Sequence, residues 1–482
     1  MMTKKNPLRR IAAAASALAL VGASALAFSA PASAAGFVPP GEDTGSLTLH
    51  KYEKDNMPGN PLEGVVFTRQ SVGTMVGGVC TAPDLNTPAG WELANSIIDS
   101  FDEVTGAMGV GCLIGAPTEF PATLADGSTT ASGLKGLYII KETSPGPNLI
   151  VAPAVPFIVS VPMPVEEGSA WDFSVDAYPK NTLTTVTPTK TVGNTNDGGS
   201  VVPGAVVPWT ITVPIPVAAF PYTTIEVSDT PSAGHTFTAW TSVQLNGVDL
   251  DAADYDATGN LLKLTDSGLA KVNAITTGDD PEVANLTVGL TTTVSADVVP
   301  STLTNKASVK LNGQTSPTGE PQSHWGKIIV TKHVKGNENA VLKDAAFNIY
   351  AKGTAATCEA AISGGATVVA SGTTDVNGEF SKILWIANAQ AADTSVKTKA
   401  YCLVETAAPA GYILDSTPRE FVLSTNNANH TTTVMFPNVK PSSAELPLTG
   451  AGGTLAMTVS GLVLVGAGAG AIAVARRRSH KA

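Results

Sequence analysis

A carboxyl group and an amine fall on the apolar faces of two predicted strands. Strand alternation places Glu405 on the same face as Tyr401 and Leu403, and Lys332 on the apolar face of segment 327–332. Burying an unpaired charge costs several kcal/mol, so burial favours a protonated carboxyl and a neutral amine. A neutral amine is a nucleophile, so this pair could perform amide chemistry. A buried salt bridge between the two groups is the alternative.

A second lysine of interest follows a proline at the end of a predicted strand. Pro179 fixes its own backbone and disfavours helix before it, so we expect Lys180 at a strand end where a large partner can reach the amine. An ordinary surface lysine is the alternative.

The N-terminal residues predict export. Lys4, Lys5, Arg9 and Arg10 precede the charge-free run 11–30 and the small residues at 32–34. This order is typical of a cleavable secretory signal over 1–34, with the mature chain beginning near Ala35; a retained membrane anchor is the alternative.

The other end predicts a membrane span. The stretch 454–475 carries no charge, and as a helix its 22 residues would measure about 33 Å. Basic residues follow it at once and favour a cytoplasmic tail, so the body of the protein is expected outside the cell.

Charge and cysteines agree with an extracellular protein. The chain has a formal net charge of −11, and all 40 acidic residues lie between the two ends, which hold eight of the 29 basic ones. Such a surface repels nucleic acid. Four cysteines in an exported chain predict the disulfides Cys80–Cys112 and Cys358–Cys402, since no ligand spacing favours a metal site. No cofactor site is predicted either.

Alternating apolar residues over short segments predict a mainly β protein with one exception. Apolar residues recur at helical spacing over 90–104, which predicts a short amphipathic helix. About 400 residues between the ends suit three tandem immunoglobulin-like β-sandwich domains, at 35–181, 182–325 and 326–440, before a C-terminal segment 441–482. Similar opening segments relate the first and third domains. In the middle domain, strands interrupted by proline at 202–203 and 213–216 are expected at sheet edges and strand ends.

Three motifs resemble those of sortase-assembled Gram-positive major pilins. The first, Leu446-Pro447-Leu448-Thr449-Gly450, stands before the apolar span and basic tail and resembles a cell-wall sorting signal. The second, 171–180, resembles the pilin motif Trp-x-x-x-Val-x-Val-Tyr-Pro-Lys and departs from it only at Ala177. The third, 401–412, resembles the pilin E-box at every specified position.

The resemblance implies a set of covalent bonds. A sortase would cut after Thr449 and join it to the amine of Lys180 in another subunit. Within each domain, an acidic residue would promote a Lys–Asn isopeptide bond, except that first domains of related pilins vary in having one. The implied sets of lysine, acid and asparagine are Lys332, Glu405 and Asn438; Lys190, Asp229 and Asn305; and Lys51, Glu142 and Asn181. Surface charge is the alternative for the middle set.

The resemblance also implies a function, which is that of the shaft subunit of a covalent pilus supporting adhesion. The protein would not be an enzyme. Its partners would be pilus-specific and housekeeping sortases, other copies of itself, minor pilins and peptidoglycan, with an unknown surface ligand. It would lie in a pilus attached to the cell wall after a precursor stage in the plasma membrane. A wall-anchored adhesin that does not polymerise and a minor base pilin are the alternatives.

Overall fold

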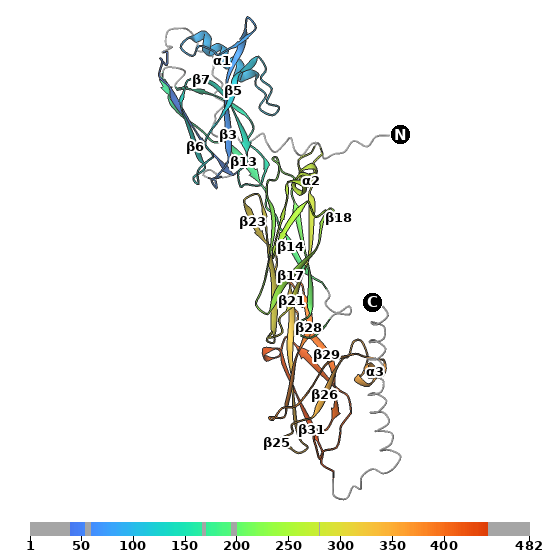
Figure 1. Cartoon of the computed structure of the whole chain (residues 1–482). Helices are drawn as coiled ribbons and strands as arrows, with labels where there is room; N and C mark the ends of the chain where they lie inside the picture. Colours follow the sequence, from blue (N-terminus) through green and yellow to red (C-terminus); the bar gives the residue numbers. More distant parts are fainter. Residues whose placement is uncertain (1–38, 54–58, 166–169, 194–199, 279, 442–482) are drawn as a thin grey trace, which may run out of the picture.

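The computed structural model describes residues 39–53, 59–165, 170–193, 200–278 and 280–441. Three β-rich units follow one another along an elongated molecule (Figure 1). Most strands bury alternate residues, as in Gly45–His50, because one face packs on a core while the other meets solvent. The mainly β sandwich fold predicted from the alternation is confirmed. The signal 1–34 and the apolar span 454–475 lie outside the described residues.

The N-terminal unit contains β1 to β13. One sheet has the order β12-β1-β6, a second the order β2-β13-β8, and a third the order β4-β3-β7-β9, with β5 beside β3 and β10-β11 as a separate hairpin. The bounds are β1 Gly45–His50, β2 Tyr52–Glu53, β3 Val66–Val76, β4 Val79–Thr81, β5 Gly111–Glu119, β6 Ser128–Leu134, β7 Gly136–Ser144, β8 Ile150–Ala152, β9 Phe157–Val161, β10 Met163–Val165, β11 Ala170–Asp172, β12 Ser174–Ala177 and β13 Lys180–Leu183.

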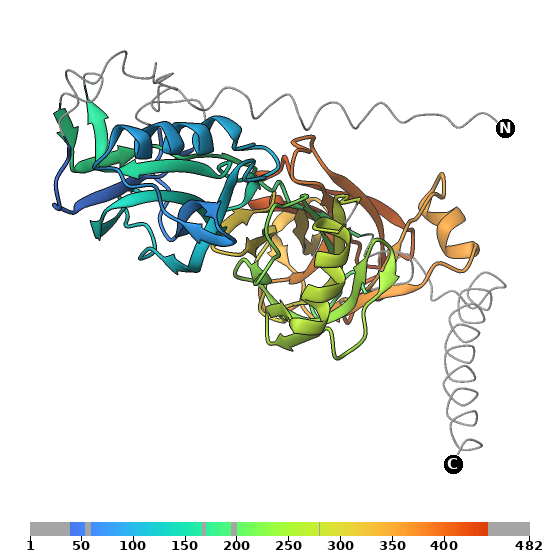
Figure 2. The same cartoon turned by 90° about the horizontal axis from the view of Figure 1, so that it is seen from above.

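The helix expected over 90–104 is α1, Pro88–Ser100. Its cap is Thr87, whose hydroxyl oxygen accepts a hydrogen bond from the Gly90 amide at 3.1 Å. Its apolar face, which includes Trp91 and Ile97, packs in one cluster with Val72 of β3. In Figure 2, α1 is the blue helix lying over the N-terminal strands.

The middle unit is a two-sheet sandwich of β14 to β23. Its sheets have the orders β14-β15-β21-β17-β18 and β19-β20-β16-β22, with β23 beside β22. The bounds are β14 Thr189–Val192, β15 Val206–Ile215, β16 Ile225–Pro231, β17 His235–Leu245, β18 Val248–Asp249, β19 Tyr255–Thr258, β20 Leu261–Leu264, α2 Asp266–Thr276, β21 Ala284–Val294, β22 Ser301–Leu311 and β23 Gln314–Pro317.

The prolines of the middle unit behave in two ways. Pro214 lies inside β15 but beyond the stretch Trp209–Thr212 that pairs with β14. Its missing N–H therefore removes no hydrogen bond between β15 and β14. The strand expected at 202–203 is wrong, because these residues form a turn that precedes β15.

The C-terminal unit shares a strand with the middle unit. Strand β24, Gln322–Val334, pairs with β22 through its first four residues and with β31 from Lys327 onward. It also pairs with β28 from Gln322 to Thr331. The expected boundary at 325/326 therefore falls inside a continuous strand. A second sheet has the order β27-β26-β29-β30. The bounds are β25 Asn337–Val341, β26 Ala346–Ala351, α3 Cys358–Ser363, β27 Val368–Thr373, β28 Glu379–Ala389, β29 Thr398–Ala407, β30 Arg419–Ser424, the 3₁₀ turn Ala428–His430 and β31 Thr431–Asn438.

Candidate functional site

A lysine, a carboxyl group and an asparagine meet in the core of the C-terminal unit. Lys332 on β24 and Asn438 on β31 come from neighbouring parallel strands, and Glu405 on β29 comes from the opposite sheet. All three are at most 1 % exposed. Lys332 Nζ lies 2.9 Å from Glu405 Oε1 and contacts Asn438 Oδ1. The Asn438 amide nitrogen donates to Glu405 Oε1 at 2.9 Å.

Aromatic rings surround this lysine. Lys332 Nζ lies 4.2 Å from the centroid of the Phe436 ring and 5.7 Å from that of Phe347. Burial lowers the pKa of the Lys332 amine, which favours its nucleophilic form. The second oxygen of Glu405 accepts a hydrogen bond from the Asp415 amide at 2.9 Å, so the carboxyl group is held from both sides.

The N-terminal unit repeats the arrangement. Lys51 directly follows β1, Asn181 lies on β13, and Glu142 reaches in from β7. Lys51 Nζ lies 2.9 Å from Glu142 Oε2 and contacts Asn181 Oδ1, while the Asn181 amide donates to Glu142 Oε1 at 2.7 Å. Both side chains of the ion pair are fully buried. Burial lowers the pKa of the Lys51 amine from 10.5 to about 8.

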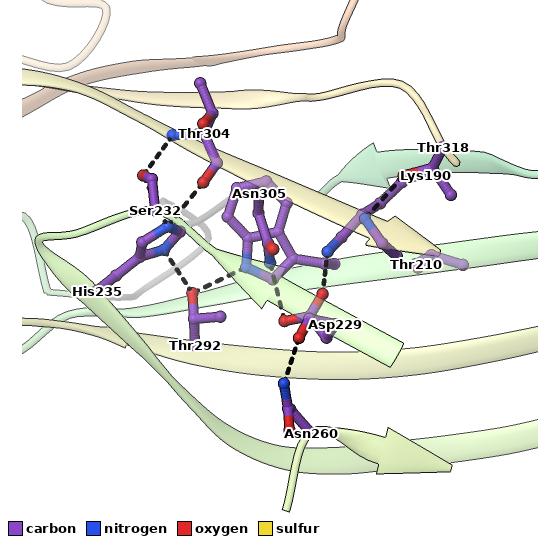
Figure 3. Close-up of polar contacts among 12 residues, drawn as sticks. Lys190, Thr210, Asp229, Ser232, His235, Asn260, Thr292, Thr304, Asn305 and Thr318 are labelled. Carbon is purple, nitrogen blue, oxygen red and sulfur yellow. Dashed lines mark hydrogen bonds and ion pairs between the residues drawn. The ribbon is translucent and has the colours of Figure 1, made fainter. Parts of the chain in front are cut away.

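The third set, in the middle unit, has a different connectivity (Figure 3). Lys190 on β14 contacts Asp229 Oδ1, across from β16. The Asn305 amide nitrogen donates to Asp229 Oδ2 at 3.4 Å, and Asn305 Oδ1 has no hydrogen-bond partner among the described residues. Burial lowers the pKa of Lys190 to about 8 and raises that of Asp229, which favours a neutral amine beside a protonated carboxyl.

Sequence reasoning missed a polar chain beside the middle set. The indole of Trp209, 5.5 Å below Lys190 Nζ, donates to Thr292 Oγ1 at 2.9 Å. Thr292 Oγ1 also lies 3.1 Å from His235 Nδ1, and His235 Nε2 lies 2.9 Å from the Thr304 carbonyl oxygen. The only signal in the sequence was a histidine within a predicted strand. Its contacts could not be read from the sequence, because Thr292 and Thr304 lie on strands of different sheets.

Lys180 is the first residue of β13 and is half-buried. It pairs with Tyr52 of β2, and the preceding Pro179 is buried. Tyr178 stacks on His50 with ring centroids 4.9 Å apart, which helps to hold the two-residue link between β12 and β13 that leads into the lysine. No ion pair holds the amine among the residues that the structure describes.

Both predicted disulfides are confirmed. Cys80 on β4 is bonded to Cys112 on β5, and Cys358 at the start of α3 is bonded to Cys402 on β29. The pentapeptide 446–450 lies outside the described residues. Within the described ranges, no helix is long and apolar enough to cross a membrane, and no group of three or more potential metal ligands occurs.

The three buried sets have the components of amide transfer. In such a transfer, a neutral lysine amine would attack the side-chain carbonyl carbon of asparagine and form a C–N bond. The neighbouring carboxyl group could hydrogen-bond the carbonyl oxygen and pass a proton to the departing –NH₂. One ammonia would leave for each amide formed, and the step would need no oxidant or cofactor.

Comparisons with known proteins cover most of the chain. Residues 42–182 match the N-terminal domain D1 of Gram-positive pilin subunits, 326–436 match the prealbumin-like fold domain SpaA, and 438–481 match the LPXTG cell wall anchor motif.

Two fimbrial subunits and a pilin structure are similar over nearly their whole length. The chain is 30% identical to the fimbrial subunit type 2 of Actinomyces naeslundii over 500 residues, which cover 91% of each protein. It is 27% identical to the fimbrial subunit type 1 of Actinomyces viscosus, over 96% of this chain and 98% of that one. The full-length major pilin SpaD from Corynebacterium diphtheriae is 25% identical, with a TM-score of 0.47, over 83% of this chain and 98% of that one.

Proposed function

This chain belongs to the family of Gram-positive fimbrial subunits with an LPXTG cell wall anchor, and from that premise we propose that it forms the shaft of the pilus through a bond between Thr449 of one copy and Lys180 of the next. The subunit is a cell-surface protein attached to the cell wall by sortase. Its role is structural, as in its relatives, and we assign it no catalytic turnover. Pilus-specific and housekeeping sortases, minor pilins and peptidoglycan complete the proposed assembly, which supports adhesion.

The position of Lys180 is the observation that supports a shaft role. Lys180 begins a strand, directly after a two-residue link that is stiffened by Pro179 and by the stacking of Tyr178 on His50. A sortase thiolate would attack the Thr449 carbonyl and release Gly450 with the rest of the tail. The Lys180 amine would then attack the thioester, form an amide and free the enzyme.

We further propose that each buried set forms its Lys–Asn bond: Lys332 to Asn438, Lys190 to Asn305 and Lys51 to Asn181. The domains would divide at 181/182 and 325/326, so each bond would join the opening strand of its domain to a late one. Burial of all three amines, together with a carboxyl group beside each, supports this chemistry. Tension along the fibre would then meet domains whose end strands are already tied.

Cells carrying Lys180→Ala test the shaft role. Wild-type cells should show an SDS-resistant ladder of this protein, and the variant should show monomer only. Lys141→Ala is the matched control, because Lys141 is a half-buried lysine of the same unit. An unchanged ladder in Lys180→Ala would instead point to another acceptor lysine, and the lack of any ladder in wild-type cells would favour a wall-anchored adhesin. A ladder lost in both variants would point to damaged folding.

A further inference from the structure

The lysine of the middle set lies on a short strand at the edge of its sheet. Strand β14 has four residues and pairs with β15 alone, so no other described strand lies along its free edge. Its buried side chains are Lys190 and Val192, which are 3 % and 6 % exposed. A short edge strand opens easily, because few hydrogen bonds hold it. The position of the Lys190 amine therefore depends on what else holds β14.

A glutamine of the C-terminal unit occupies the free edge of β14. The Val192 amide donates to Gln390 Oε1 at 3.2 Å, and Gln390 Nε2 donates to the Val192 carbonyl oxygen at 3.0 Å. The side-chain amide thus makes both hydrogen bonds that a residue of a neighbouring antiparallel strand would make. Asn388 Nδ2 adds a hydrogen bond to the Gly193 carbonyl oxygen at 2.6 Å. The end of β28 therefore holds the end of β14, two residues beyond Lys190.

The same end of the C-terminal unit also adjoins the asparagine of the middle set. Thr304 of β22 pairs with Gln322 of β24, and Gln322 pairs with Ala389 of β28, so these residues lie side by side on adjacent strands. Asn305 directly follows Thr304, and its backbone amide donates to the Pro321 carbonyl oxygen at 3.1 Å. The C-terminal unit therefore contacts the segments that carry both reacting groups of the middle set.

Trp385 anchors this end of β28 in the middle unit. Its side chain is 6 % exposed and belongs to the core cluster of that unit, at the junction seen in Figure 1. The Trp385 amide donates to the Val201 carbonyl oxygen at 2.8 Å, and its indole Nε1 donates to Asn388 Oδ1 at 3.0 Å. The second bond leaves the Asn388 amide nitrogen free to donate to Gly193. The hold on β14 thus requires a folded β24–β28 ladder in the C-terminal unit.

We propose that Gln390 is a positioning residue for the Lys190–Asn305 bond, and that the middle unit completes this bond rapidly only when the C-terminal unit is folded. This inference rests on the proposed crosslinks and adds an order to them. Lys332, Glu405 and Asn438 make their mutual contacts within the C-terminal unit, so their bond can form first. Gln390 takes no part in the amide transfer itself and acts through β14.

Gln390→Met in the full chain tests this role. Methionine keeps the length and bulk of the side chain but can make neither hydrogen bond, and Gln390 is exposed, so the change leaves the core intact. Chains made by cell-free synthesis under oxidising conditions would be quenched at intervals and digested, and mass spectrometry would quantify each crosslinked peptide. We expect the Lys190–Asn305 bond to form severalfold more slowly than in the wild type, because two hydrogen bonds on β14 are lost. The Lys332–Asn438 bond in the same chains should keep its rate.

Gln244→Met is the matched control. Gln244 lies on β17, in the same sheet as β14, and its side-chain amide donates to Asp249 Oδ1 at 2.8 Å. The change removes a glutamine hydrogen bond from the middle unit without touching β14, so both crosslinks should form at wild-type rates. A wild-type rate for the middle bond in Gln390→Met would overturn the positioning role. An equal slowing of the C-terminal bond, or of the middle bond in Gln244→Met, would also overturn it, because either would indicate general damage to folding.

Hydrogen exchange provides a second test that does not need the bond. In Asn305→Ala the Lys190–Asn305 bond cannot form, and adding Gln390→Met should raise amide exchange over residues 189–192 severalfold, whereas adding Gln244→Met should not. Unchanged exchange would refute the hold on β14. A wild-type chain that never forms the Lys190–Asn305 bond would refute the proposed crosslink, and the exchange measurement would then decide separately whether Gln390 holds the strand.

Discussion

The C-terminal and middle sets contain the same kinds of group but draw them from different sheets. In the C-terminal unit, Lys332 and Asn438 lie on adjacent parallel strands and the acid reaches across from the other sheet. In the middle unit, Asp229 and Asn305 lie on the adjacent strands β16 and β22, and Lys190 reaches across. A bond in the first would tie two neighbouring strands, whereas a bond in the second would tie the two sheets together.

The difference also shows in which atom each amine contacts. Lys332 touches both the acid and the amide oxygen, while Lys190 touches the acid and leaves Asn305 Oδ1 without a partner among the described residues. In the middle unit, the Asp229 carboxyl group therefore contacts both the amine and the amide nitrogen, each through a different oxygen.

Glu405→Gln should have the largest effect on this comparison. Glutamine keeps the shape but cannot supply the proton, so the C-terminal bond should not form and the intact mass should retain one ammonia. The bond closes a loop of 106 residues, and by the chain-entropy model its loss should lower the unfolding free energy by about 4–5 kcal/mol. Mass spectrometry and thermal unfolding measure the two effects. Glu379→Gln, an exposed carboxylate of the same unit, should change neither.

Asn305→Ala tests which group of the middle unit is joined to Lys190. We expect it to abolish the middle crosslink and leave the other two in place, with a loss of stability similar to that of Glu405→Gln. Peptide mass mapping should show Lys190 joined to Asn305 in the wild type. A Lys190–Asp229 crosslink, recognised by loss of water in place of ammonia and retained in Asn305→Ala, would show instead that the contacting acid is the acyl donor.

The sequence could predict the members of these sets better than their arrangement. The E-box placed Glu405 on an apolar face, and the alternation around Lys332 placed its amine in the core, because both follow from local periodicity. The sheet from which each group comes depends on pairings between strands far apart in the chain, which no local pattern specifies: Asp229 and Asn305 are 76 residues apart, and Lys332 and Asn438 are 106 residues apart. For the same reason the continuous β24 and the contacts of His235 could not be anticipated.

The pH dependence of stability separates the N-terminal and middle sets once their bonds are prevented. In Asn181→Ala, Lys51 stays an amine with a folded pKa near 8 and an ordinary value of 10.5. The unfolded chain then binds more protons between these values, so stability should rise with pH from about 8 to 10.5. The wild type, whose amine is an amide in our proposal, should show no such rise from this residue. Thermal unfolding at stepped pH measures it.

The middle unit should show an additional, opposite slope. Burial raises the pKa of Asp229 above 3.8, so in Asn305→Ala the folded chain holds a proton that the unfolded chain has lost. Stability should therefore fall as pH rises above 3.8 through the folded pKa of Asp229, before the rise from Lys190 begins near pH 8. A monotonic profile in Asn305→Ala would contradict the neutral pair.

Thr292→Val should have the smallest effect and tests the support beneath Lys190. The Thr304 carbonyl can only accept, so His235 Nε2 carries the proton and Nδ1 accepts from the Thr292 hydroxyl. The same hydroxyl oxygen accepts from Trp209 Nε1, so valine leaves one buried donor and one buried acceptor unpaired. We expect a loss of about 1–3 kcal/mol in unfolding free energy, with the Lys190 crosslink still formed because no reacting group is removed.

Thr291→Val is the control, because Thr291 is the neighbouring, half-buried residue, and it should lower the unfolding free energy far less. A crosslink missing in Thr292→Val would show that the polar chain positions the amine, a demand that the C-terminal set, held by Phe436 and Phe347, does not share.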